Sequence, residues 1–235
     1  MVKKVIFGIL VILTLFINFY PFSQRDYIVN SYALVFDLSL VFLCISKVRK
    51  NFEIRNFLFL FLLSLILWTI GDSIILFKTI TNIPLKFVAL EDIFYMLFPI
   101  PIFLIYSKII KSKRAPFQPF TISLGIISLI VLTIGILYPL IFLNPSTSSI
   151  ERFVWIYYTI TDWLMILLAV ISLQSLNKNV EYKFLTSIFI FSLLYGLADI
   201  IFSMSALWLT PPENIVNSSL IYEFSFFPLL WFLIN

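Results

Sequence analysis

The sequence has no histidine, a single cysteine and only five glycines among its 235 residues. Without histidine, acid–base catalysis by an imidazole is excluded, and with one cysteine no disulfide can form within the chain. The same scarcity argues against a zinc, haem or iron–sulfur site, so we expect no cofactor and assign no catalytic residue; a metal held by other ligands is left open. Charged residues make up only 12% of the chain, against about 25% in soluble domains. This composition excludes an ordinary water-soluble fold.

The chain is instead rich in apolar residues. Hydrophobic residues account for 61%, including 27 phenylalanines, and the mean hydropathy is +1.06. A helix needs about 20 apolar residues to cross the hydrocarbon core of a bilayer, and eight runs approach that length. They lie at about 5–22, 28–46, 57–78, 88–109, 119–143, 152–174, 184–208 and 218–235. We therefore predict an all-α integral membrane protein with eight transmembrane helices, whose principal partner is the lipid bilayer.

The basic residues are divided unevenly between the two sides of this predicted bundle. Twelve fall on one side: Lys3, Lys4, Lys47, Arg49, Lys50, Arg55, Lys108, Lys111, Lys113, Arg114, Lys178 and Lys183. Four fall on the other: Arg25, Lys78, Lys86 and Arg152. Loops rich in Lys and Arg stay in the cytoplasm, so we predict a multi-pass protein of the cell membrane with both termini cytoplasmic. The net charge of +4 then reflects membrane orientation, and we expect no nucleic-acid partner.

The two halves of the chain resemble each other in the order of their buried acids. Asp37 matches Asp162, Asp72 matches Asp199, and an acid followed by a proline recurs in the pairs Asp92 with Pro99 and Glu223 with Pro228. Four helices, an even number, separate the copies, so both halves have the same orientation in the membrane. We predict one membrane domain made of two parallel four-helix repeats, at about 1–115 and 116–235.

Seven acids lie in or near the predicted helices, although a carboxylate at bilayer depth is costly unless it is paired, solvated or protonated. Glu91 lies closest to a helix end, where we expect water to reach it. The other acids, with one tyrosine, are the candidate ligand-binding residues: Asp37, Asp72, Asp92, Tyr95, Asp162, Asp199 and Glu223. Three interpretations follow. The acids are protonated packing groups, or they line a cavity toward the outer side that binds a cation, an amine or protons, or a partner protein supplies the counter-charge.

One stretch resembles a known family. Gly71-Asp72 precedes an apolar run, and Leu90-Glu91-Asp92-Ile93-Phe94-Tyr95-Met96-Leu97-Phe98-Pro99 follows. These residues are similar to the multi-helix membrane sensor regions that precede GGDEF or histidine-kinase modules in prokaryotes. The resemblance covers Gly71, Asp72, Asp92, Tyr95 and Pro99 by position, and it implies signalling. Because no output domain follows the last predicted helix, the resemblance implies either a separate signalling protein as partner or a truncated relative that has lost its output domain.

Three functions are compatible with these features. The first is a non-enzymatic, receptor-like sensor module with an acid-lined cavity toward the outer side. The second is a small secondary transporter or cation-binding carrier, which the repeat and the acids favour. Transporters often break their helices at glycine, however, and the chain has only five. The third is an intramembrane enzyme that hydrolyses lipid, which the missing histidines make the weakest of the three.

Overall fold

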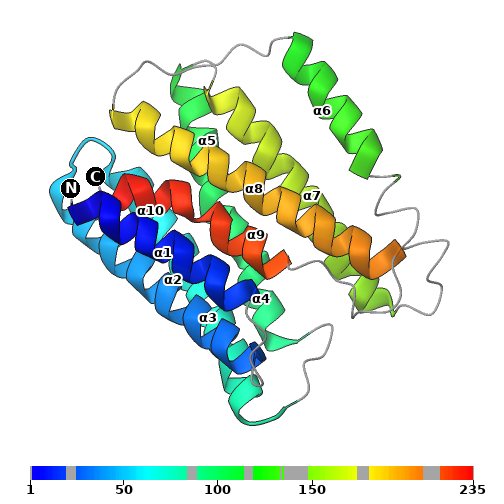
Figure 1. The fold of residues 1–235 in the computed structure, drawn as a ribbon. Coiled ribbons are helices and arrows are strands. Elements are labelled where there is room, and N and C mark those ends of the chain that lie inside the picture. Colours follow the sequence, from blue (N-terminus) through cyan, green and yellow to red (C-terminus); the bar gives the residue numbers. More distant parts are fainter. Residues whose placement is uncertain are drawn as a thin grey trace. The chain divides into compact units, whose positions relative to one another are not determined.

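The computed structural model describes residues 2–19, 25–83, 89–113, 119–132, 134, 148–173, 180–208 and 218–234. Within these residues the regular secondary structure is helical and no strand is present (Figure 1). The helices are α1 (Val2–Phe19), α2 (Arg25–Lys50), α3 (Arg55–Ile80), α4 (Leu90–Leu97), α5 (Pro99–Lys113), α6 (Pro119–Leu132), α7 (Ser149–Leu173), α8 (Val180–Trp208), α9 (Ser218–Ser225) and α10 (Phe227–Ile234). The all-α prediction is therefore confirmed for the described part of the chain.

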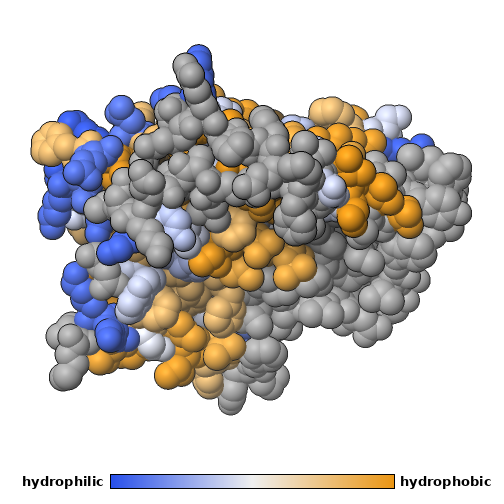
Figure 2. Space-filling view, turned by 90° about the horizontal axis from the view of Figure 1, so that it is seen from above, coloured by the Kyte–Doolittle hydropathy of each residue, from blue (hydrophilic) through white to orange (hydrophobic). Residues whose placement is uncertain are grey.

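Five stretches of these helices are long and apolar enough to cross a membrane, which supports a membrane protein. They are Asp26–Lys50, Arg55–Ile80, Leu90–Lys111, Ser149–Ser172 and Tyr182–Asp199. Large apolar side chains are exposed along them, for example Phe42 at 73% and Phe59 at 61%. Among the coloured residues of Figure 2, hydrophobic ones gather near the centre of the face shown. Water does not favour such a surface, whereas lipid does.

The chain divides into two compact units. Unit 1 comprises Met1–Ile105 and Phe226–Asn235, and unit 2 comprises Tyr106–Ser225. In unit 1, α3 packs against both α2 and α4, and α10 packs against α1 and α2. Aromatic rings hold α10 in place, since the Phe227 ring lies 5.5 Å from those of Phe7 and Phe36. The last helix of the chain therefore completes the unit that the first helices begin.

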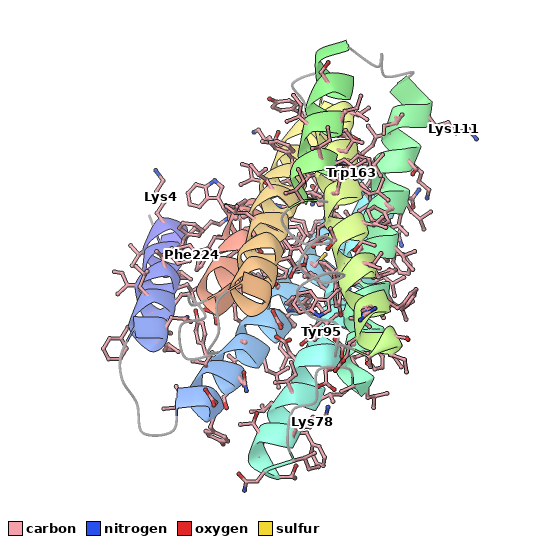
Figure 3. All side chains as sticks on the ribbon, turned by 90° about the vertical axis from the view of Figure 1, so that its right-hand side faces the viewer. Lys4, Lys78, Tyr95, Lys111, Trp163 and Phe224 are labelled. Atoms are coloured by element: carbon pink, nitrogen blue, oxygen red, sulfur yellow. The ribbon has the colours of Figure 1, made fainter. Side chains whose placement is uncertain are left out.

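In unit 2, α8 packs against α7 and α9, and α6 packs against α7. The Trp163 indole of α7 donates hydrogen bonds to the Gly125 carbonyl and the Ser128 hydroxyl of α6, at 3.1 and 3.0 Å (Figure 3). The buried Tyr106 hydroxyl of α5 pairs with the Ser192 hydroxyl of α8 at 2.8 Å. These hydrogen bonds link α6 to α7 and α5 to α8.

Two of the eight predicted helices are each broken into two. The run predicted at 88–109 forms α4 and α5, interrupted at Phe98, and the run at 218–235 forms α9 and α10, interrupted at Phe226. A proline follows each break, and proline removes a helix hydrogen bond and clashes with the preceding turn. The Ser64 hydroxyl donates to the Phe98 carbonyl at 2.9 Å, so the first break is held by a polar contact from α3.

Basic residues lie at both ends of unit 1, as expected for helices that cross a bilayer. Lys4, at the start of α1, and Lys78, near the end of α3, lie at opposite ends of unit 1 (Figure 3). Some cations counted for the orientation lie outside the described residues, or have side chains that do: Arg25, Lys86, Lys113, Arg114 and Lys178.

Candidate functional site

Three helices of unit 1 bring two aspartates and a tyrosine together. The Tyr95 hydroxyl on α4 donates a hydrogen bond to Asp72 Oδ1 on α3. The Asp72 carboxyl is also within hydrogen-bonding contact of the Asp37 carboxyl on α2 and of the Trp68 indole. We call Asp37, Trp68, Asp72 and Tyr95 the unit 1 acid cluster.

Helical spacing and one glycine account for this geometry. Trp68 and Asp72 are four residues apart and so share a face of α3. The ring centroids of Trp68 and Tyr95 are 4.8 Å apart, which places the tyrosine against the same face of α3. A Cβ on Gly71 would lie 2.6 Å from Tyr95 Cε1, closer than side-chain carbons approach. Glycine at 71 therefore lets Tyr95 reach Asp72.

Unit 2 contains a second cluster that also joins two aspartates and a tyrosine, with Tyr195 at the position that corresponds to Trp68. The Tyr222 hydroxyl on α9 donates to Asp199 Oδ1 on α8, and the Asp199 carboxyl is within hydrogen-bonding contact of the Asp162 carboxyl on α7. Tyr195, four residues before Asp199, has its ring centroid 5.4 Å from that of Tyr222. We call Asp162, Tyr195, Asp199 and Tyr222 the unit 2 acid cluster. Each cluster thus takes one residue from each of three helices, plus an aromatic residue one turn before the second aspartate.

Each cluster combines one buried aspartate with one that is partly buried. Asp37 and Asp162 are each only 3% exposed, while Asp72 and Asp199 are partly buried. Asp199 Oδ2 is a buried oxygen that no donor reaches within the described residues. In the same part of the chain no Lys or Arg forms an ion pair with Asp72, Asp162 or Asp199; the described ion pair joins Lys78 to Glu91.

A proton shared between the two carboxyl groups is compatible with this arrangement. Two ionised carboxylates in contact repel each other strongly away from water, whereas one proton placed between them removes a charge and makes a hydrogen bond. A protonated Asp162 would supply the donor that Asp199 Oδ2 lacks in the described residues. Each cluster is therefore a place where one proton, or a small cation in its stead, has two carboxyl groups to bind.

The structure gives two other predicted site residues different surroundings. Asp92 lies in the first turn of α4, where its Oδ2 accepts a hydrogen bond from the Ala89 amide at 2.8 Å. That contact caps the helix, because the first amides of a helix have no partner within it. Glu223 follows Tyr222 on α9 and is 7% exposed.

Glu91 is not in water, as its position near a helix end had led us to expect. It is 5% exposed, and its two carboxylate oxygens accept hydrogen bonds from Lys78 Nζ at 2.7 and 2.5 Å. The pair joins the end of α3 to the start of α4. An unpaired carboxylate at this depth would be costly, so the lysine explains how Glu91 can be buried.

Sequence reasoning did not include Trp68, Tyr195 or Tyr222 among the site residues. A signal for Tyr222 was present, since it follows Asp199 by 23 residues, the same interval that separates Asp72 from Tyr95. Within the described residues no group of three His, Cys, Asp or Glu side chains is arranged to hold a metal ion.

No protein-family model, no curated protein and no solved structure matches the chain. The function is therefore inferred from the chemistry of the two clusters and from the helices that carry them.

Proposed function

We propose that the chain is a small proton-coupled carrier of the cell membrane, and that each acid cluster binds one exchangeable proton. The observation that carries this proposal is the repeated contact between two aspartates and a tyrosine, once in each unit. A single cluster of this kind is compatible with packing alone. Its recurrence, each time beside a broken helix, favours a role in binding.

The matched contacts support two parallel repeats. The interval between Asp72 and Asp199 is the same as that between Tyr95 and Tyr222, and the two tyrosines make the same contact. The two helix breaks, at Phe98 and Phe226, are separated by nearly the same interval. Similar contacts at constant spacing point to duplication of one four-helix unit, a common origin of transporter folds.

This spacing also refines the pairing of the acids. At the interval that relates the two tyrosines, Asp92 corresponds to Ser219, and Glu223 corresponds to Met96. The sequence comparison paired Asp92 with Glu223 instead. Asp92, which caps a helix, therefore has no acidic counterpart in the second half, and the buried Glu223 has none in the first. The two halves share the aspartates and tyrosines of the acid clusters, and they differ at these two acids.

The broken helices favour a carrier over a purely structural bundle. Carriers commonly bind their substrates and coupling ions beside helices that are interrupted within the membrane. Tyr95 and Tyr222 each lie a few residues before such a break, on the short helices α4 and α9. The scarcity of glycine does not oppose this function, because these breaks occur beside Pro99 and Pro228.

The predicted orientation places the unit 1 acid cluster toward the outer half of the membrane. Asp72 precedes Lys78 by fewer than two helical turns, or about 9 Å along the helix. With both termini in the cytoplasm, the end of α3 that carries Lys78 faces outward. Protons from the outer side would then reach Asp72 over a short distance.

The test is electrical current from purified protein in liposomes. An inward pH gradient is applied on a solid-supported membrane in the presence of each of a panel of sugars, amino acids, amines and metal cations. We expect current with at least one solute, and its loss in Asp72→Asn and Asp199→Asn. Asp26→Asn is the matched control, since Asp26 is an exposed aspartate of α2. Absence of current throughout the panel, or equal currents in wild type and both Asn variants, refutes the carrier.

A sensor module is the second candidate, and one observation favours it. Gly71, Asp72 and Tyr95, which carry the resemblance to prokaryotic sensor regions, lie in direct contact. A sensor predicts that protonation changes the distance between α3 and α4 without any solute current. Spin labels on these helices, measured across pH beside the current assay, separate the two functions.

The contact between two carboxyl groups also favours, more weakly, an acid–base enzyme. Aspartic proteases use a pair of carboxyl groups that share one proton. A lipid-hydrolysing enzyme of this type would release product from labelled phospholipid or lysophospholipid in detergent micelles, and it would lose that activity on Asp162→Asn. Turnover in this assay would replace the carrier with an enzyme.

A further inference from the structure

One end of unit 1 gathers positive charge. The start of α1, the end of α2 and the start of α3 meet there, and they contribute Lys3, Lys4, Lys47, Arg49, Lys50 and Arg55. Within the stretch 47–55 the acid is Glu53. Hydrophilic side chains gather at the left of Figure 2, the side on which Figure 1 shows the start of α1 and the turn between α2 and α3.

The fold holds several of these charges close to one another. Lys47 is near enough to Lys3 and Lys50 for their charges to repel it. Its ammonium also lies 5.1 Å from the centroid of the Phe232 ring on α10, so its position is fixed by a helix from the far end of the sequence. Like charges held in this way destabilise the fold unless an anion lies beside them. The surface is therefore built to accept negative charge.

An exposed aromatic ring stands among the cations. Phe52, in the turn between α2 and α3, is 79% exposed, while Ile54 beside it is 1% exposed and anchors the turn. The turn is ordered by hydrogen bonds from the Asn51 amide to the Lys47 carbonyl at 3.1 Å and from the Arg55 amide to the Phe52 carbonyl at 3.4 Å. Phe52 therefore projects outward from a fixed backbone.

We propose that this surface, formed by Lys3, Lys47, Arg49, Lys50, Phe52 and Arg55, binds anionic phospholipid head groups. Clustered Lys and Arg at the membrane surface attract anionic lipids, and each contributes to the attraction. An apolar ring beside them suits the boundary between head groups and acyl chains. Free phosphate would satisfy the cations and leave Phe52 in water. A lipid satisfies both.

The Arg55 guanidinium adds a specific contact to this surface. It lies 5.8 Å from the centroid of the Phe52 ring. A planar guanidinium can bind two phosphate oxygens at once, which an ammonium cannot. Its place over the ring sets the phosphate of a bound lipid beside the aromatic side chain. The head group and the upper acyl chain would then contact adjacent residues.

The test counts bound lipid by native mass spectrometry on protein in neutral detergent. Wild type is titrated with phosphatidylglycerol, phosphatidylcholine and inorganic phosphate. We expect phosphatidylglycerol to bind at least about tenfold more tightly than phosphatidylcholine. The variant Arg49→Gln/Lys50→Gln/Arg55→Gln should lose that preference, and Phe52→Ser should weaken phosphatidylglycerol binding severalfold. All of these side chains are exposed, so thermal melts should match wild type.

The matched control removes two exposed lysines elsewhere, Lys111→Gln with Lys183→Gln. It should keep the preference for phosphatidylglycerol. Equal binding of the two lipids by wild type, an unchanged preference in the triple variant, or an equal loss in the control would overturn the proposal. Binding of inorganic phosphate as tight as that of phosphatidylglycerol would also overturn it, because the ring would then play no part.

Discussion

Replacing Gly71 by alanine should disrupt the unit 1 acid cluster, and the structure sets the size of the effect. The added Cβ would lie 2.6 Å from Tyr95 Cε1 and 2.7 Å from Cζ, about 1 Å closer than a normal carbon contact. Overpacking of this kind costs about 1–3 kcal/mol. The Tyr95 ring must also move away from Asp72, and the loss of the hydrogen bond between them costs about 1 kcal/mol.

Part of that loss is offset, because alanine is favoured over glycine within a helix by about 0.5–1 kcal/mol. We therefore expect Gly71→Ala to destabilise the protein by about 2 kcal/mol, or a fall of roughly 4–8 °C in Tm. The assay is a thermal melt followed by tryptophan fluorescence, since Trp68 lies against the displaced ring. Combining the change with Tyr95→Ala should remove most of the added cost, because the two residues are in contact.

Gly8→Ala is the internal control. Nothing lies within 4 Å of the position where its Cβ would be built, so the change should be neutral or slightly stabilising. At Gly196 the nearest atom is the terminal Cδ1 of Ile166 at 2.7 Å, a flexible side-chain end that can move aside. Gly196→Ala should therefore fall between the other two. If Gly71→Ala is as stable as Gly8→Ala, Tyr95 does not lie against α3 and the described cluster is wrong.

Four further single substitutions test other contacts by the same melts. Tyr95→Phe and Tyr222→Phe should each cost about 1 kcal/mol by removing one hydrogen bond, and unequal costs would argue against equivalent clusters. Glu91→Gln should cost about 3 kcal/mol because it leaves the largely buried Lys78 ammonium without its carboxylate partner. Adding Lys78→Met to that variant should restore part of the loss. An unchanged Tm would show that the pair lies in water. Phe226→Ala should cost about 3–5 kcal/mol, since the ring is 2% exposed and lies against Trp68; a loss below 1 kcal/mol would separate the end of the chain from unit 1.

Composition and hydropathy predicted the helical class because few backbone structures are stable inside a bilayer. Backbone groups in lipid must be satisfied within the segment, so long apolar runs form helices. Proline lacks a backbone N–H, so Pro99 favours a break in the helix that contains it. Pro228 favours the second break for the same reason. The lengths of the short helices were not predictable in the same way, because they depend on contacts such as that between Ser64 and the Phe98 carbonyl.

The site was only partly predictable, for a physical reason. Periodicity shows which residues share a helix face, as Trp68 and Asp72 do on α3. It does not show how far one helix slides along another, which side-chain packing decides. Asp92 and Tyr95 share a face of α4, yet Tyr95 reaches Asp72 while Asp92 turns to the Ala89 amide. The burial of Glu91 by Lys78 depends on the same register.

We propose that each pair of aspartates holds a proton, and infrared difference spectroscopy measures protonated carboxyl groups directly. A protonated carboxyl has a carbonyl stretch that is separate from the carboxylate bands. Purified protein in lipid should show this band, with part of its intensity lost in Asp72→Asn and a further part in Asp199→Asn, while Asp26→Asn leaves it unchanged. A wild-type spectrum without a protonated carboxyl band, or a band that neither cluster variant alters, would show that the aspartate pairs hold no proton.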